Sequence, residues 1–198
     1  MEVDEKTLVS LVKDAPNVLG QIYTDLAHPS VQAVGKALGT VFEFSTSFLL
    51  PVKLLNEKFR LNFEKRLDEY RKKLETIPED KRCEVHPQIG TPIVEKLSYT
   101  TTEEIADLYT SLLASASNKD TENLAHPAFI SIIEKLSVDE ARIINYLSTI
   151  DVIQYCQFRA YGKNSTGFSV IEPSKLTMLP ERVSLSYPSN LMAYLNNL

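Results

Sequence analysis

The clearest pattern in the sequence is a row of apolar residues spaced three or four apart over residues 52–77. This spacing averages about 3.5 residues, which is typical of one face of a long helix that packs against other helices. We therefore predict a long amphipathic helix over 52–77. We expect five residues of this row to form a seam for a partner helix, namely Phe59, Phe63, Leu67, Tyr70 and Leu74.

Three shorter stretches before residue 51 also carry apolar residues at helical spacing, and prolines separate them. The third, over residues 30–50, is apolar around much of its circumference. Its glycines, Gly35 and Gly39, lie four apart and allow another backbone to approach closely. We predict an N-terminal helical hairpin or bundle over 1–77. The candidate packing or membrane-facing residues of helix 30–50 are Val34, Gly35, Leu38, Gly39, Val41, Phe42 and Phe48.

The helical pattern of the sequence ends between residues 77 and 92, where it is interrupted by Pro78, Pro87, Pro92 and Gly90. We predict a connection over 78–98. A C-terminal domain over 99–198 follows, with helices near 102–117, 127–136 and 138–149. Capping-box spacings at 101–104 (TTEE) and 137–140 (SVDE) mark two of these helix starts.

The end of the chain adds a small β element to this mainly α fold. Residues 152–161 and 168–171 are rich in β-branched and aromatic residues and flank turn-forming residues 162–167, which predicts a small β-hairpin. Helices followed by a hairpin also permit a winged-helix-like layout. The last apolar run, 191–198, stops without a C-cap, and we expect the C-terminal domain to be truncated at its end.

Charge and composition narrow the classes of partner. The chain has 198 residues and a net charge of −5, and residues 99–198 hold seven Lys or Arg against eleven Asp or Glu. A nucleic-acid partner is not expected, because that binding depends on basic residues that neutralise phosphates. The acidic start lacks the features of a secretory signal, and Cys83 and Cys156 are the only cysteines, so we expect a cytoplasmic protein. Their pairing stays open.

Candidate catalytic and metal-binding residues have simpler explanations. His28, His86 and His126 each precede a proline, which is typical of a helix boundary. Cys83 and His86 have the spacing of metal ligands, but no second close pair completes a zinc site. We find no catalytic motif, so we expect no enzyme activity, metal, cofactor or small-molecule ligand. An uncharacterised enzyme remains a third hypothesis, which requires a convergent polar pocket.

Helix 30–50 and the segment after it allow two interpretations. Residues 53–73 contain eight Lys or Arg against four Asp or Glu. An apolar helix beside a basic one is typical of an element that lies on a membrane surface. The alternative, which we favour, is that both helices form a core and contact a partner helix.

Six segments in fixed order resemble the bacterial abortive infection alpha (Abi-alpha) family over roughly residues 15–150. They are 23–29 (YTDLAHP), 34–39 (VGKALG), 50–57 (LPVKLLNE), 112–116 (LLASA), 126–129 (HPAF) and 136–141 (LSVDEA). The resemblance implies a role in phage defence and carries over no catalytic residue.

Three function hypotheses follow. The first is a non-enzymatic abortive-infection protein that acts through protein contacts or at the inner face of the membrane. The second is a soluble helical interaction or regulatory module, with a protein partner or a homo-oligomer. The third is the uncharacterised enzyme.

Overall fold

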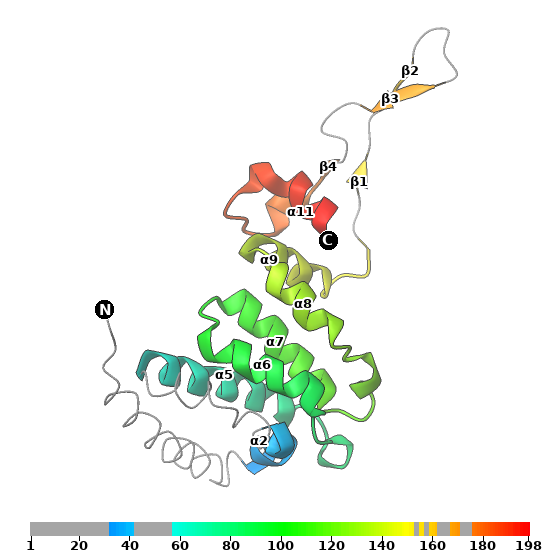
Figure 1. The fold of residues 1–198 in the computed structure, drawn as a ribbon. Coiled ribbons are helices and arrows are strands. Elements are labelled where there is room, and N and C mark those ends of the chain that lie inside the picture. Colours follow the sequence, from blue (N-terminus) through cyan, green and yellow to red (C-terminus); the bar gives the residue numbers. More distant parts are fainter. Residues whose placement is uncertain (1–31, 42–56, 153–154, 157–158, 162–166, 171–175) are drawn as a thin grey trace. The chain divides into compact units, whose positions relative to one another are not determined.

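The computed structural model describes residues 32–41, 57–152, 155–156, 159–161, 167–170 and 176–198 (Figure 1). These residues are mainly helical, which confirms the predicted fold class. They form two compact units, a first unit within Met1–Glu134 and a second unit within Lys135–Leu198. The boundary between these two units lies near residue 134.

The first unit is built from helices that surround α5 (Glu57–Glu75). Helix α5 packs against α6, α7 and α2, and α6 also packs against α7 (Figure 1). The other elements are α2 (Gln32–Ala37), η1 (Glu79–Lys81), α6 (Pro87–Tyr99), α7 (Glu103–Ala116), η2 (Glu122–Leu124) and α8 (Ala128–Lys135).

Helix α5 lies within the predicted helix 52–77, whose residues 52–56 lie outside the described part of the chain. Its apolar seam faces the interior. Phe63, Leu67, Tyr70 and Leu74 are at most 5% exposed and belong to the core of the first unit, whereas Phe59 is 37% exposed. The predicted periodicity thus follows from burial against helices of the same chain.

Helix α6 corrects the prediction that residues 78–98 form a connection. His86 caps the helix start, where its Nδ1 accepts a hydrogen bond from the Gln88 backbone N–H at 3.2 Å, and Pro87 occupies the first turn. Pro92 lies inside the helix and lacks a backbone donor. The helix forms nevertheless because it buries one apolar face in the core, made of Ile89, Ile93, Val94 and Leu97.

Gly90 of α6 lies close to the Val41 side chain, which follows α2 in the sequence. A Cβ atom on Gly90 would lie 2.3 Å from Cγ2 of Val41, so no side chain fits there without movement. A Cβ on Gly39 would lie 3.5 Å from Glu84 Oε1, which is an ordinary contact. We predicted close approach at Gly35 and Gly39; the contact at Gly39 is an ordinary one, the prediction for Gly35 stays a prediction, and the tight contact is at Gly90.

Polar side chains of α5 hold the corner between α6 and α7. The Asn62 amide donates to the carbonyl oxygens of Leu97 and Thr100, at 3.2 and 3.1 Å. Arg66 is 1% exposed, and its guanidinium donates to Glu103 at 2.7 Å and to the Thr101 carbonyl at 3.3 Å. Carbonyl groups at a helix end need such partners because the helix itself leaves them unpaired.

This corner also corrects the predicted capping box at Thr101. The N-cap of α7 is Thr102, and its side chain makes no capping hydrogen bond. Glu103, in the first turn, instead pairs with Arg66 and Lys65, both at 2.7 Å. These two cations lower the pKa of Glu103 to about 2.

The second unit combines short helices with short strand pairs. Strand β1 pairs antiparallel with β4, and β2 with β3, in the register Arg159 opposite Val170. The strands are two or three residues long and do not establish a winged-helix-like layout, which stays a prediction. The elements are α9 (Val138–Leu147), β1 (Tyr155–Cys156), β2 (Arg159–Tyr161), β3 (Phe168–Val170), β4 (Leu176–Thr177), α10 (Leu179–Arg182), η3 (Pro188–Asn190) and α11 (Leu191–Asn197).

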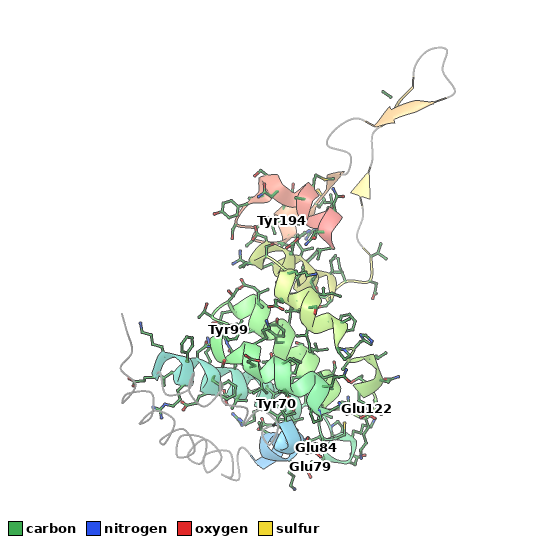
Figure 2. The ribbon with its side chains drawn as sticks, in the orientation of Figure 1. Tyr70, Glu79, Glu84, Tyr99, Glu122 and Tyr194 are labelled. Carbon is green, nitrogen blue, oxygen red and sulfur yellow. The ribbon has the colours of Figure 1, made fainter. Side chains whose placement is uncertain are left out.

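The start of α9 anchors the end of the chain. The capping box at Ser137 and Glu140 is confirmed, with both of its hydrogen bonds formed. Buried Asp139 accepts hydrogen bonds from the backbone N–H groups of Ser186 and Tyr187, at 2.8 and 2.9 Å, and from the Tyr194 hydroxyl at 3.1 Å (Figure 2 labels Tyr194). Burial alone would raise the pKa of Asp139, but these bonds together lower it.

Gly90→Ala is expected to destabilise the first unit by about 1–3 kcal/mol, because the new methyl group would overlap Val41. Gly39→Ala is the matched control and should have little effect. Urea denaturation followed by circular dichroism measures both. Val41→Ala should recover part of the loss in the Gly90→Ala background. Equal effects of the two glycine substitutions would contradict the tight contact.

Asp139→Asn is expected to lower the free energy of unfolding of the second unit by about 2–4 kcal/mol, because an amide nitrogen cannot accept the buried hydrogen bonds. The folded-state pKa of Asp139 lies below its ordinary value of 3.8, so its stabilisation is present above that pH and is lost as pH falls through the folded-state pKa. The difference between the wild type and the variant should therefore shrink in acid.

Urea titrations followed by the NMR signals of residues 186–194 measure this difference at several pH values. Asp151→Asn, at an exposed position of the same unit, is the control. A difference that stays constant down to pH values far below 3.8 would show that the Asp139 carboxylate is not the group responsible.

Candidate functional site

The candidate residues of helix 30–50 lie in the interior of the first unit where the structure describes them. Val34, Leu38 and Val41 are fully buried, and Gly35 and Gly39 are partly exposed. Phe42 and Phe48 lie outside the described residues. With the α5 seam from Phe63 to Leu74, the buried members make up much of one apolar core. The structure thus brings the two predicted sets together as packing partners within the chain.

Two of the three histidines mark helix boundaries, as predicted. His86 caps α6, and His126 Nδ1 accepts a hydrogen bond from the Ala128 backbone N–H at 3.1 Å at the start of α8. His28 lies outside the described residues.

Cys83 carries a free thiol, which lies close to Glu122 and not to a set of metal ligands. The thiol sulfur lies 3.3 Å from Glu122 Oε2 and 3.6 Å from the Ala116 carbonyl oxygen, so its single hydrogen has two alternative acceptors (Figure 2 labels Glu122). Burial, and then the neighbouring Glu122 carboxylate, raise the pKa of this thiol to about 11. Within the described residues, no three His, Cys, Asp or Glu side chains are grouped so that they could hold a metal ion.

Among the residues that the structure describes, an open cavity of about 230 Å³ in the second unit is a candidate binding site. Two segments form it, one at the end of α9 and just beyond, and the other from the end of β4 through α10. Its lining combines apolar side chains with polar atoms in nearly equal measure, and Thr177, Arg182 and the Tyr146 hydroxyl supply polar side-chain groups. The residues that line it are Tyr146, Ile150, Val152, Thr177, Met178, Leu179 and Arg182.

Local structure holds this cavity in shape. Leu179 is buried with Ile143 in the apolar core of the second unit, and this burial fixes the start of α10. The Thr177 hydroxyl accepts a hydrogen bond from the Leu179 backbone N–H at 3.3 Å and supports the first turn of α10. The rim is exposed, since Val152 and Met178 are 74% and 57% exposed. A buried floor and an apolar rim favour a pocket that receives a group from outside.

Arg182 supplies the charge of this cavity. It is exposed, and it makes no hydrogen bond or ion pair with any residue that the structure describes. Asp151 and Glu181, which follow and precede lining residues in the sequence, are exposed carboxylates. The cavity is therefore suited to an apolar group that carries a single carboxylate within reach of the guanidinium.

Sequence reasoning did not find this cavity. Its residues come from two segments about 25 positions apart in the sequence, and none belongs to a motif. The apolar residues Val152 and Met178 give no signal in the sequence, because neither their exposure nor their proximity follows from their spacing.

The family model for abortive infection alpha matches residues 58–198, which is well over half of the chain. The chain belongs to the abortive infection alpha family. The matched region of this Abi-alpha protein runs from α5 to the last residue and includes the whole cavity. The resemblance noted above was placed at 15–150, so the match extends further toward the C-terminus and leaves out the segments at 23–29, 34–39 and 50–57.

No curated protein and no solved structure matches the Abi-alpha chain. Among its described residues, none of the helices combines the length and the apolar character that crossing a membrane requires.

Cys83 is expected to react slowly with iodoacetamide at pH 8, because a thiol with a pKa of about 11 is mostly protonated there. Glu122→Gln should accelerate the reaction, since it removes the carboxylate that opposes thiolate formation. The rate is measured by mass spectrometry in a Cys156→Ser background. Glu79→Gln, at an exposed carboxylate that pairs with Arg82 only at 3.9 Å, is the control. A rate that does not depend on Glu122 would contradict this assignment.

Proposed function

We propose that this Abi-alpha protein acts in phage defence as a non-enzymatic cytoplasmic protein that works by binding another protein. The observation that carries the defence role is the family match over residues 58–198. The open cavity of the second unit supports a binding role, because exposed apolar side chains beside a cationic side chain are typical of protein interaction sites.

The alternative of membrane association has less support from the first unit. The apolar residues Val34, Leu38 and Val41 contact the interior of the chain, so they are not available to lipid. The basic residues of α5 are largely paired with carboxylates of the same chain. These pairs are Lys65 with Glu103, Arg66 with Glu69, Arg71 with Glu75, Lys72 with Asp68 and Lys73 with Asp107.

The α5 seam is also a weaker candidate for the contact with a partner. Phe63, Leu67, Tyr70 and Leu74 are already buried by α6 and α7. A partner helix on this seam would have to displace helices of the first unit, which would expose the apolar core to water. We therefore place the partner contact on the second unit.

The lining of the cavity favours binding over catalysis. Its described residues include no carboxylate, imidazole or thiol that could act as a general base or nucleophile. Arg182 and Thr177 are suited to orienting a bound group.

Expression of the gene in a phage-sensitive host is expected to lower plating of some phages and to lower survival of infected cells, because abortive infection stops phage at the expense of the infected cell. Plaque counts and colony counts after infection, with and without the gene, measure both effects. Unchanged plating across a broad phage panel, with the protein present at normal levels, would contradict the defence role.

A further inference from the structure

We propose that the cavity lined by Tyr146, Met178 and Arg182 is the docking site for a segment of a partner protein that presents one apolar side chain next to a carboxylate. The inference rests on the proposed binding function and names the chemistry of the partner.

The size of the cavity favours a single side chain. At about 230 Å³ it lies below the roughly 300–1,000 Å³ that is usual for pockets that enclose cofactors and drug-sized ligands. A pocket of this size suits an anchor residue of a protein interface, where one buried side chain contributes much of the binding energy.

The rim favours a protein partner over a free small molecule. Val152 and Met178 line the open cavity and are 74% and 57% exposed. A small ligand would leave much of these two side chains in water, whereas a polypeptide that continues beyond its anchor residue would cover them. The flexible, polarizable side chain of Met178 can adapt to such a surface.

Charge complementarity identifies the second feature of the partner. The Arg182 guanidinium has five N–H donors, and no described residue accepts from them. A carboxylate can accept two of these N–H groups side by side, which fixes its position relative to the apolar group. The partner segment therefore carries Asp or Glu next to the apolar anchor.

The surroundings disfavour an anionic membrane as the occupant. Asp151 and Glu181 are exposed carboxylates next to lining residues in the sequence, and a surface dense in lipid phosphates would be repelled by them. A single carboxylate that reaches Arg182 avoids most of this repulsion. The second unit also lacks a run of basic residues of the kind that binds anionic lipid, since residues 135–198 hold six Lys or Arg against five Asp or Glu.

The test starts from a displayed library of random short peptides selected on the purified full-length chain. We expect the enriched peptides to share Leu, Ile, Met or Phe close to Asp or Glu, and to be lost when selection is repeated on Arg182→Gln or Met178→Ser. Both substitutions are at exposed positions and should leave the fold intact. Enrichment of peptides without the acidic residue, or equal enrichment on the Arg182→Gln chain, overturns the proposal.

Fluorescence anisotropy with one enriched peptide then measures each contribution. Replacement of its acidic residue by the matching amide should weaken binding by roughly tenfold on the wild-type chain and should have little effect on Arg182→Gln, since the same interaction is removed in both. Two controls should bind as the wild type does. They are Arg60→Gln on α5 and Leu124→Ala, an exposed apolar position of the first unit.

A parallel measurement uses vesicles of phosphatidylglycerol in place of the peptide. Vesicle binding that requires Arg182 and Met178 would assign the cavity to lipid and overturn the proposal. Plating assays separate the two levels of inference. If Arg182→Gln abolishes peptide binding and the variant gene still protects against phage, the cavity is not the surface used in defence. If the wild-type gene gives no protection, the proposed defence function itself is wrong.

Discussion

Burial of one face of α5 is the constraint on which the first unit depends. Its apolar residues meet α2, α6 and α7 along a single helix, so each of these helices gains its core through the same seam. Buried Tyr70 shows how closely the helices must fit. Its hydroxyl donates to Ser117 at 2.5 Å, while Ser117 in turn donates to the Leu113 carbonyl at 2.7 Å (Figure 2). Burial raises the pKa of Tyr70 well above its usual range. A change in the position of α5 would therefore disturb both apolar packing and this buried polar chain.

The prediction of the fold succeeded where periodicity and capping chemistry agreed. The seam of α5 and the Ser137 capping box are local patterns, and tertiary contacts reinforce both. Helix α6 was missed because Pro92 and Gly90 are unfavourable inside a helix on local grounds, while their role depends on neighbours distant in the sequence. Arg66 belongs to the basic segment 53–73, for which a membrane surface was the less favoured of two interpretations. Its burial follows from Glu103 and the Thr101 carbonyl, which no local pattern connects to it.

The candidate site could not be predicted from local sequence patterns. The predicted site residues are apolar and helical in spacing, and such residues serve packing more often than recognition. The cavity instead depends on how the chain beyond α9 returns to it, which is a property of the whole second unit. Asp139 illustrates the same limit. Its sequence position indicates only the first turn of a helix, yet it holds residues 186–194 through three hydrogen bonds.

These anchoring bonds have a consequence for the order of folding. In the first unit, α5, α6 and α7 follow one another in the sequence, so their contacts form by closing short loops. Asp139 lies 47 to 55 positions before its partners, so the entropy of a long loop must be lost before the second unit gains its stability. We expect the helical hairpins of the first unit to form early, and the cavity beside Arg182 to be completed among the last events. A newly made chain would then acquire its core before it acquires the surface that recognises a partner.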